Sequence, residues 1–541
     1  MMDFTKKRVL IIDDSSAMCA SLKHTLGNLG IGKCETSNSG NEAIFRIRQR
    51  EFDIIVCDYC LGEGSDGQQI LEQLRKSSLI SPSVAFLMVT AERGYEKVVS
   101  CAELAPDDYL LKPFTPETIR LRLERVFEKK ETFKVVYELL AQGNSAGAIV
   151  ECDRLLDLKN KFAIDLIRMK GELLISLDRH EEARVLYEQV ISARAIPWAK
   201  IGLAKTLSMA GMVEEAIEIL ELAIADTPQY LEAYDLLAKE HETQGQTALA
   251  QAILEQAVEI SPQTLSRQTH VGEMAYRNGD LEKAKRAFGI VVDQGKYSFF
   301  RSPSDFIRLS KVHLDEGQQD KALSVIADAR KSFDKTPDFE LETSVMESLI
   351  YHGASNREAS MLALEKALEM KEKNGLVLPE SSHLDLAKSC FLNDKVEEGR
   401  SLVKDIVSNF YDDEKVQAMV GQMLEQVGRA EESKELVENS VRDVIKLNNE
   451  GVLLAKKGDL AGAIALLVSA AQRMPQNVQV ALNAAHALIV DSDRNGWNET
   501  QMDMARYLLR EHEAKYSSLE KYKKINGMMK EVGLKFGVNI T

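Results

Sequence analysis

The chain has 541 residues, which is too long for a single hydrophobic core and predicts several domains or an extended repeat structure. Its 68 basic and 84 acidic residues give a formal net charge of −16, which repels phosphate backbones and argues against nucleic-acid binding. No apolar run approaches the roughly 20 residues that cross a bilayer, and the first short apolar run soon meets two aspartates, unlike a secretory signal. We therefore expect a cytoplasmic protein without membrane insertion.

Seven cysteines are scattered along the chain. Cys57 and Cys60 fit the C-x-x-C spacing that can mark a redox or zinc site. Cys57, however, ends an apolar run that is typical of a buried strand, and the sequence contains no second pair of this kind. Free thiols in a reducing compartment are the simpler interpretation, and a redox or metal site is the alternative.

Short β-branched runs alternate with amphipathic stretches over about the first 125 residues. The runs predict strands over residues 9–12, 34–37, 52–57, 84–90 and 109–111, and the stretches predict helices over residues 16–29, 40–50, 67–76 and 95–101 and from Pro116 onward. Five strands separated by helices indicate an α/β doubly wound fold, a five-stranded parallel sheet covered on both faces. In such sheets functional residues gather at the carboxyl ends of the strands.

Beyond residue 130 the strand signals vanish, and a helical period with an internal repeat replaces them. The mark of each unit is a glycine followed five residues later by an alanine, and it begins at Gly211, Gly245, Gly279, Gly317 and Gly458. Looser copies centre on Ala148, Ala183, Ala359, Gly399 and Ser433. Two antiparallel helices approach closely only where the facing side chains are small, and the glycine turns the chain between them. The pattern therefore predicts a stack of helix pairs.

This pattern resembles the tetratricopeptide repeat (TPR), although the Trp-Leu-Gly-Tyr start of the family is mostly absent. The resemblance implies an all-α superhelical solenoid of about nine to ten repeats, some degenerate, over residues 129–510. Residues 296–303 look like an inserted loop and residues 491–497 like a second break. Helices over residues 511–541 are expected to cap the open end of the stack.

Polar residues follow four strands of the predicted sheet. They are Asp13 and Asp14 after the first strand, Asp58 after the third, Thr90 after the fourth, and Lys112 with Pro113 after the fifth. Three carboxylates that meet repel one another unless a cation joins them, and Mg²⁺ is a natural partner for oxygen ligands. A lysine and a hydroxyl beside that ion would stabilise an incoming phosphoryl oxygen. The set therefore suits phosphoryl transfer to a carboxylate.

These residues resemble the CheY-type receiver domain of two-component signalling, which has a flavodoxin-like fold, and we assign it residues 1–128. The resemblance implies that Asp58 accepts the phosphoryl group. It also implies a Mg²⁺ site. Asp14 and Asp58 would bind the ion directly, and Asp13 would bind it through a water molecule. The backbone carbonyl of Cys60 would supply a further ligand. Three further residues would switch position or contact the phosphoryl group: Thr90, Tyr109 and Lys112. The Lys112–Pro113 peptide bond would be cis.

The sequence departs from the receiver pattern after the phosphoacceptor. The family often has Met-Pro before Asp-Gly, whereas this chain has a glycine-rich loop over residues 61–67. Cys60 and Glu92 occupy positions that tune dephosphorylation in the family, and no phosphate lifetime follows from them.

Between the predicted domains no proline- or glycine-rich linker intervenes. Apolar positions keep a helical period from Pro116 to Gly143, about 27 residues or roughly 40 Å of helix. One hypothesis is a single helix that joins the receiver mechanically to the first repeat. The alternative is two helices with a kink near Lys129 and Lys130.

The resemblances imply several partners. A sensor histidine kinase or a phosphotransfer protein would supply the phosphoryl group, and a second receiver would give a homodimer. A protein or peptide is expected in the TPR groove, where Asn449 and Asn483 lie 34 residues apart at equivalent positions. Their amides could clamp a peptide backbone, and two solvated polar residues are the alternative.

The expected function is a response regulator whose output is protein–protein interaction. It would not be an enzyme beyond its own phosphoryl transfer and dephosphorylation. The architecture resembles the VieB-like group of bacterial regulators, which suggests inhibition or modulation of a sensor kinase as one alternative, and a constitutive TPR scaffold is another. Gly-Gly-Asp/Glu-Glu-Phe, Glu-Ala-Leu and His-Asp motifs are absent from the sequence, as is a terminal basic helix-turn-helix, so neither a cyclic-nucleotide enzyme nor a DNA-binding output is expected.

Overall fold

A computed structural model of the chain describes residues 4–61, 67–77, 79–90, 106–193, 196–262, 264–295, 301–374, 378–516 and 519–538. It forms two compact units, Met1–Val312 and His313–Thr541. The predicted helix over residues 95–101, Glu92 and most of the glycine-rich loop lie outside the described residues.

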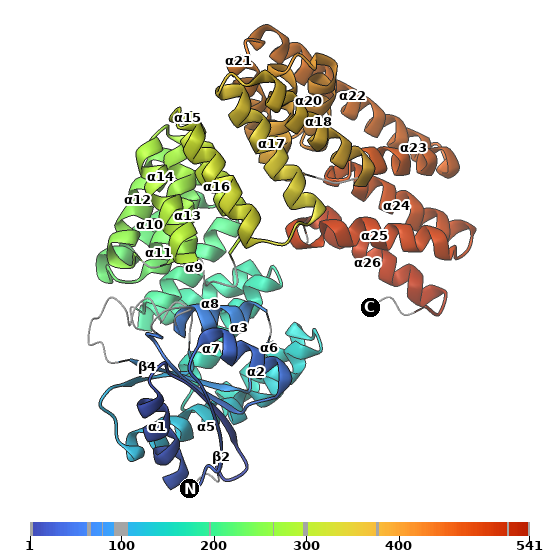
Figure 1. The fold of residues 1–541 in the computed structure, drawn as a ribbon. Helices are drawn as coiled ribbons and strands as arrows, with labels where there is room; N and C mark the ends of the chain where they lie inside the picture. Colours follow the sequence, from blue (N-terminus) through green and yellow to red (C-terminus); the bar gives the residue numbers. More distant parts are fainter. Residues whose placement is uncertain are drawn as a thin grey trace. The chain divides into compact units, whose positions relative to one another are not determined.

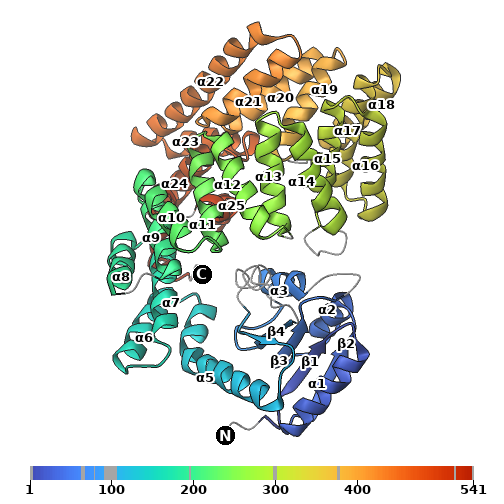
Figure 2. The ribbon, with the colours of Figure 1, turned by 90° about the vertical axis from the view of Figure 1, so that its left-hand side faces the viewer.

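The N-terminal part is a five-stranded parallel sheet in the order β2-β1-β3-β4-β5 (Figures 1 and 2). Its strands are β1 (Arg8–Ile12), β2 (Lys33–Ser37), β3 (Ile54–Asp58), β4 (Ala85–Thr90) and β5 (Asp108–Leu111). The described helices are α1 (Ser16–Asn28), α2 (Gly40–Gln49), α3 (Gly67–Lys76) and α5 (Pro116–Ala141). One apolar cluster joins α1 and α5 to one face of the sheet, and another joins α2 and α3 to the opposite face. The doubly wound fold predicted from the sequence is confirmed.

Helix α5 is one continuous helix of 26 residues, which confirms the hypothesis of an unbroken connection (Figure 2). Thr115 caps its first turn, since its side chain accepts a hydrogen bond from the Thr118 amide, and Pro116 suits the first helical position. The N-terminal half buries Ile119 among the side chains of the sheet core, and the C-terminal half buries Phe133 in the core of the first repeat. The same rigid element therefore belongs to both cores.

A buried lysine fastens α5 to the amino-terminal edge of the sheet. Lys130 is 7% exposed, and its Nζ donates to the Pro82 carbonyl at 2.6 Å and pairs with the Asp107 carboxylate at 2.8 Å. The other oxygen of Asp107 accepts from the Phe86 amide of β4 at 2.8 Å. Burial holds the pKa of Lys130 below its usual value, even though Asp107 acts to raise it. The connecting helix is thus tied to the segments that precede β4 and β5.

Beyond α5 the described chain is helical. The helices are α6 (Ser145–Asp157), α7 (Ala163–Ser176), α8 (His180–Ala193), α9 (Pro197–Met209), α10 (Val213–Asp226), α11 (Leu231–Thr243), α12 (Thr247–Ile260), α13 (Leu265–Arg277), α14 (Leu281–Gln294), α15 (Pro303–Asp315), α16 (Gln319–Ser332), α17 (Pro337–Gly353), α18 (Arg357–Asn374), α19 (Glu380–Leu392), α20 (Val396–Asn409), α21 (Glu414–Gln426), α22 (Ala430–Lys456), α23 (Leu460–Arg473), α24 (Val478–Asn495), α25 (Glu499–Tyr516) and α26 (Glu520–Lys535). Among the described residues, none of these helices combines the length and the apolar character that a bilayer crossing requires.

The glycine and alanine that mark each repeat in the sequence have the predicted structural roles. The five glycines that mark the repeats all have positive φ, between 74° and 90°, and lie in the turns between paired helices: Gly211, Gly245, Gly279, Gly317 and Gly458. The alanine five residues after each glycine is fully buried. In looser copies Asp178, Ser355 and Asp394 adopt the same left-handed conformation. At Gly272 of α13 an added Cβ would lie 2.6 Å from the Phe288 ring of α14, which shows how closely the paired helices approach.

Two details of the repeat prediction are wrong. The unit centred on Ala359 is shifted by one residue, because the buried small side chain five positions after the Ser355 turn is Ser360. The break expected over residues 491–497 begins too early, since α24 runs to Asn495 and ends before Gly496, which has a φ of 103°. Of the expected inserted loop, residues 296–300 lie outside the described residues, and α15 begins at Pro303. The boundary at residue 510 stays a prediction, and α25 spans it.

Candidate functional site

The candidate site lies at the carboxyl edge of the sheet, where the parallel strands end side by side. Asp58 is the last residue of β3 and is paired in register with Val89 of β4. Thr90 ends β4, and its carbonyl accepts from the Lys112 amide at 2.8 Å just after β5. Strand β1 also ends at this edge, so Asp13, the residue after its last residue Ile12, lies there too. The sheet topology therefore brings together residues up to 99 positions apart.

Three carboxylates form the acidic part of the site. One oxygen each from Asp13, Asp14 and Asp58 lies within 4.8 Å of the other two. Asp13 and Asp58 are buried, at 1% and 9% exposure, whereas Asp14 is exposed and opens the cluster to solvent. Hard divalent cations such as Mg²⁺ prefer oxygen ligands. The donor set thus suits such a cation.

Lys112 supplies the positive charge of the site. Its Nζ lies 3.2 Å from Asp13 Oδ2 and 3.1 Å from Asp58 Oδ1, so it bridges the two buried carboxylates. Burial raises the pKa of Asp58, and the charge of Asp13 adds to this effect, while Lys112 opposes it. Burial acts to lower the pKa of Lys112, but the hydrogen bond and charge of Asp58 raise it overall. One ammonium against three carboxylates leaves the edge with an excess of negative charge.

Local backbone contacts fix the two buried aspartates. The Ser15 amide donates to Asp13 Oδ1 at 2.9 Å and holds that carboxylate against the end of β1. Gly67, the first residue of α3, passes so close to β3 that an added Cβ would lie 2.3 Å from the Asp58 carbonyl oxygen. Its amide also donates to the Tyr59 carbonyl at 2.9 Å. Gly67 was predicted only as the end of the glycine-rich loop and the start of a helix, yet any side chain there would displace the backbone that carries Asp58.

The remaining predicted receiver residues lie around this centre. Thr90 is buried, Tyr109 is half-buried against the apolar cluster that contains α2 and α3, and Cys60 is an exposed residue two positions after Asp58. The Lys112–Pro113 peptide bond is cis. Cys57 is buried within β3, as expected of an inert thiol. The roles of Thr90, Tyr109 and the Cys60 carbonyl stay predictions.

The asparagines expected to line a peptide groove are arranged differently from the expected pair. Asn483 of α24 donates its side-chain amide to Asn448 of α22 at 2.6 Å, and the neighbouring Asn449 is exposed. Asn449 and Asn483 thus lie on the different helices α22 and α24, and the asparagine that contacts Asn483 is Asn448. Peptide binding by Asn449 and Asn483 stays a prediction.

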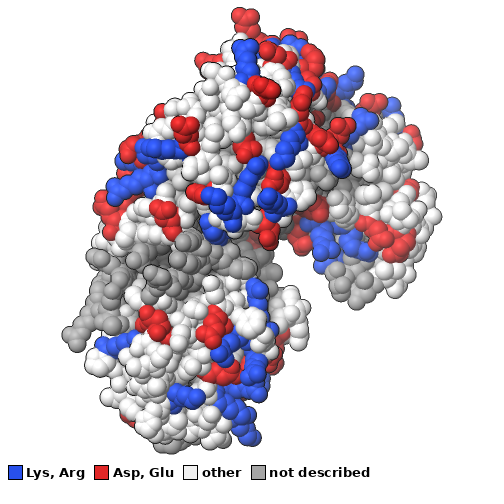
Figure 3. Space-filling model, viewed as in Figure 1, with Lys and Arg blue, Asp and Glu red and all other residues white. Residues whose placement is uncertain are grey.

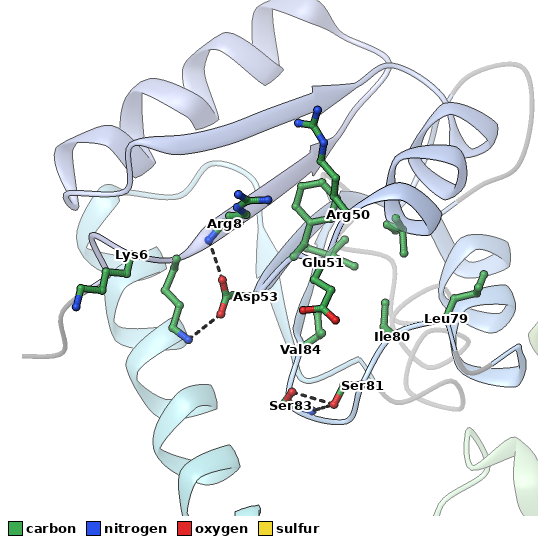
Figure 4. Close-up of a pocket in the computed structure, with 14 residues that line it drawn as sticks. Lys6, Arg8, Arg50, Glu51, Asp53, Leu79, Ile80, Ser81, Ser83 and Val84 are labelled. Atoms are coloured by element: carbon green, nitrogen blue, oxygen red, sulfur yellow. Dashed lines mark hydrogen bonds and ion pairs between the residues drawn. The ribbon is translucent and has the colours of Figure 1, made fainter.

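A cavity of about 580 Å³ at the opposite, amino-terminal edge of the sheet is a weaker candidate (Figure 4). Its carboxylate, Asp53, already accepts from Lys7 Nζ at 2.8 Å and from the Arg8 amide at 2.9 Å. Although burial acts to raise it, these bonds hold the pKa of Asp53 below its usual value. Asp53 therefore already has a cation partner of its own in Lys7, whereas the three carboxylates of the opposite edge share one lysine.

The surface charge of the helical part is mixed. In Figure 3 basic and acidic side chains alternate over the coloured residues of the face shown, without one continuous basic patch among them. This distribution agrees with the net charge of −16 and gives no support to nucleic-acid binding on that face.

Comparison with protein families identifies both parts of the chain. The model of the response regulator receiver domain matches residues 9–124, and that of the tetratricopeptide repeat matches residues 169–196 and 231–264. Chemotaxis protein CheY-3 of Vibrio cholerae is 30% identical over 122 residues, which are 23% of this chain and 92% of that protein. The alkaline phosphatase synthesis transcriptional regulatory protein PhoP of Bacillus subtilis is 28% identical over 198 residues, 35% of this chain and 78% of that one.

Solved structures give matches to each part separately. Chemotaxis protein CheY4 of Vibrio cholerae is 31% identical and matches with a TM-score of 0.21, covering 22% of this chain and 98% of that chain. A tetratricopeptide repeat protein from Parabacteroides merdae is 14% identical and matches with a TM-score of 0.30, covering 44% of this chain and 92% of that chain.

Proposed function

Because this chain belongs to the response regulator receiver family and carries TPR repeats behind its receiver domain, we propose that Asp58 accepts a phosphoryl group and that the repeats pass the signal to a protein partner. The observation that carries the proposal is the cluster of Asp13, Asp14 and Asp58 bridged by Lys112 at one sheet edge. A phosphorylated sensor histidine kinase or phosphotransfer protein is the expected donor.

In the proposed transfer, a carboxylate oxygen of Asp58 attacks the phosphorus of the donor. A new O–P bond forms as the bond between phosphorus and the donor's leaving atom breaks, and the leaving group takes that electron pair. Lys112, already 3.1 Å from Asp58, lies where it can neutralise charge on the transferred group. Bound Mg²⁺, held by Asp13, Asp14 and Asp58, would supply charge neutralisation between the carboxylates and the incoming oxygens.

Intact-mass spectrometry after incubation with acetyl phosphate and magnesium tests this proposal. The wild-type chain should gain the mass of one phosphoryl group as acetate leaves, and the gain should disappear in Asp58→Asn. Asp53→Asn is the matched control, because Asp53 precedes the same strand at the opposite edge, and it should still be labelled. An unchanged wild-type mass, while a known receiver treated in parallel is labelled, would refute the proposal.

The unbroken helix α5 supports an output through the repeats. The added phosphate brings roughly −1.5 to −2 charge to the carboxyl edge, beside Thr90 at the end of β4. The other ends of β4 and β5 are tied to α5 through Phe86, Asp107 and Lys130. We propose that a shift of these strands on phosphorylation changes the repeats through this helix. Hydrogen exchange over residues 125–135 should be slow in at least one phosphorylation state, and fast exchange in both would contradict mechanical coupling.

A pull-down of partners separates this function from a constitutive TPR scaffold. Beryllofluoride-loaded wild-type protein and the Asp58→Asn variant should recover different partners, or the same partner in different amounts. Identical recovery would favour the scaffold. Recovery of a sensor kinase whose phosphotransfer falls in the presence of the chain would favour a kinase modulator.

A further inference from the structure

A groove of about 700 Å³ with both apolar and charged lining residues lies in the second compact unit. Its longest wall is one stripe of α20: Glu398, Ser401, Leu402, Asp405 and Asn409. Eleven positions of helix make that wall roughly 16 Å long. The volume falls within the range of roughly 300–1,000 Å³ that is typical of ligand pockets. An elongated groove of this size suits a linear ligand such as a peptide segment.

The groove runs along the second helices of two repeats, since α17 packs with α18 and α19 with α20. Helix α18 contributes Leu368, Lys371 and Glu372, and the end of α23 contributes Arg473. It is therefore formed mainly by second helices, with His383 contributed by the first helix α19, and it does not contain Asn449 or Asn483, where peptide binding was expected.

Buried amides close one end of the groove. Asn409 Oδ1 accepts from the Gln476 amide at 2.8 Å, and Asn477, 1% exposed, donates to the Ser408 carbonyl at 2.7 Å. The Asn477 side chain also caps α24 by accepting from the Val480 amide. These contacts join residues 67 and 69 positions apart. The groove is therefore held open by satisfied hydrogen bonds of the fold.

Two polar groups of the groove are left without partners among the described residues. The Asp405 carboxylate makes no hydrogen bond or ion pair there; burial raises the pKa of Asp405, although Lys371 and Lys404 act to lower it. His383 Nε2 is buried and accepts and donates no hydrogen bond. Burial lowers the pKa of His383 to about 4, so its imidazole is neutral near pH 7 and Nε2 can accept a hydrogen bond in the Nδ1–H tautomer.

The lining of the groove as a whole favours a cationic ligand with an aliphatic stem, although the charge of Lys371 already acts on both Asp405 and His383. The groove is lined by three carboxylates, of Glu372, Glu398 and Asp405, against two cations, and its most buried charge is negative. A half-buried carboxylate without a partner gains most from a cation that also donates hydrogen bonds. Leu378 and Leu402 provide an apolar wall for methylene groups.

We propose that this groove binds a peptide segment of a partner protein through a lysine or arginine side chain that pairs with Asp405 and donates to His383 Nε2. The proposal is independent of phosphoryl transfer, because none of these residues belongs to the receiver and the groove is complete in the unphosphorylated chain.

Selection from a phage-displayed random peptide library on the immobilised full chain tests the proposal. Wild-type protein should enrich peptides with lysine or arginine at one fixed position, and Asp405→Asn should lose this enrichment. Asp443→Asn is the matched control, since Asp443 is an exposed aspartate of α22 that faces Lys404, and it should select the same peptides as wild type.

Calorimetry with one selected peptide then tests the same pairing without any substitution in the protein, so a misfolded variant cannot explain the result. Replacing its basic residue by neutral citrulline should weaken binding to the unchanged wild-type chain at least about tenfold, as loss of a charge-assisted pair predicts. The proposal is overturned if no peptide is enriched, if Asp405→Asn selects the same basic peptides, or if citrulline binds as well as arginine.

Discussion

The receiver domain and the helical repeats bury and pair their charges in opposite ways. At the receiver edge three carboxylates share one ammonium, so the charges balance only when a cation joins them. By contrast, the ion pair of Lys205 and Glu232, 2.6 Å apart on the first helices of successive repeats, joins one cation to one carboxylate. An imbalance of charge thus distinguishes the candidate site of the receiver from such a pair. It also draws attention to Asp405, a repeat carboxylate that is not paired in this way.

The largest effect is expected from removal of a buried charge that already has a partner. Lys130→Met leaves Asp107 without its buried partner and should lower the local free energy of unfolding around β4 by about 3 kcal/mol. Hydrogen exchange of the Phe86 amide measures this value. The matched variant Lys129→Met, which removes an exposed ion pair with Asp165, should change it by less than about 1 kcal/mol.

A double variant checks the cause of that loss. Lys130→Met combined with Asp107→Asn removes both charges and keeps an acceptor for the Phe86 amide, so much of the lost stability should return. Equal exchange in the single and double variants would show that the packing of the lysine stem, not its charge, holds α5.

The second compact unit is expected to lose stability in acid. The pKa of His383 is lowered to about 4 in the folded chain, whereas the unfolded imidazole titrates near 6.5. The unfolded state therefore binds the extra proton first, and stability present above pH 6.5 is lost as the pH falls toward 4, by up to about 3 kcal/mol. Denaturant unfolding followed by Trp497 fluorescence in a Trp198→Phe background should show this loss. His383→Gln should weaken the pH dependence, and an unchanged profile would contradict the assignment.

At Asp58 a substitution of a buried residue is expected to raise stability, whereas most such substitutions lower it. Without magnesium, Asp58→Asn removes one of three crowded carboxylates and should stabilise β3 by about 1–2 kcal/mol. Hydrogen exchange of the β3 amides in EDTA measures the gain. Added magnesium should stabilise wild type more than the variant, because the variant lacks one anionic ligand. A loss of stability in EDTA would mean that Lys112 already balances the cluster.

The smallest effect is expected where charges pair one to one at the surface. Lys205→Met removes an ion pair whose two side chains are 40% and 35% exposed, and it should cost less than about 1 kcal/mol. High salt should shrink even this difference. A loss as large as that of Lys130→Met would remove the distinction between the two regions.

The sequence was most informative where one residue type is dictated by backbone geometry. The turn glycines were predicted correctly because the left-handed conformation between paired helices favours glycine, and the alanines because only small side chains fit there. Strands β1, β3 and β4 were recognised from apolar runs that the fold buries almost completely. The carboxyl-edge residues followed from the topology, since parallel strands place their ends together.

The features that the sequence did not predict depend on contacts between residues that are distant along the chain. Lys130 escaped notice because an apolar period gives no sign that a lysine will be buried against a carboxylate 23 residues earlier. The contact of Asn483 with Asn448 was not predicted, because a 34-residue spacing does not fix the rotation of α22. The extension of α24 to Asn495 depends on helix packing that the polar residues near Asp491 do not reveal.

Because α5 is continuous, its length fixes the rotation of the first repeat about the helix axis relative to the receiver. In an α-helix each inserted residue advances the downstream chain by about 1.5 Å and turns it by about 100°, whereas seven residues return to nearly the same angle, within about 20°. An insertion after Lys130 would therefore leave the receiver core intact and rotate the side from which Phe133 and Val136 meet the first repeat. Length changes in this helix should be tolerated in steps of seven residues and resisted in steps of one or two.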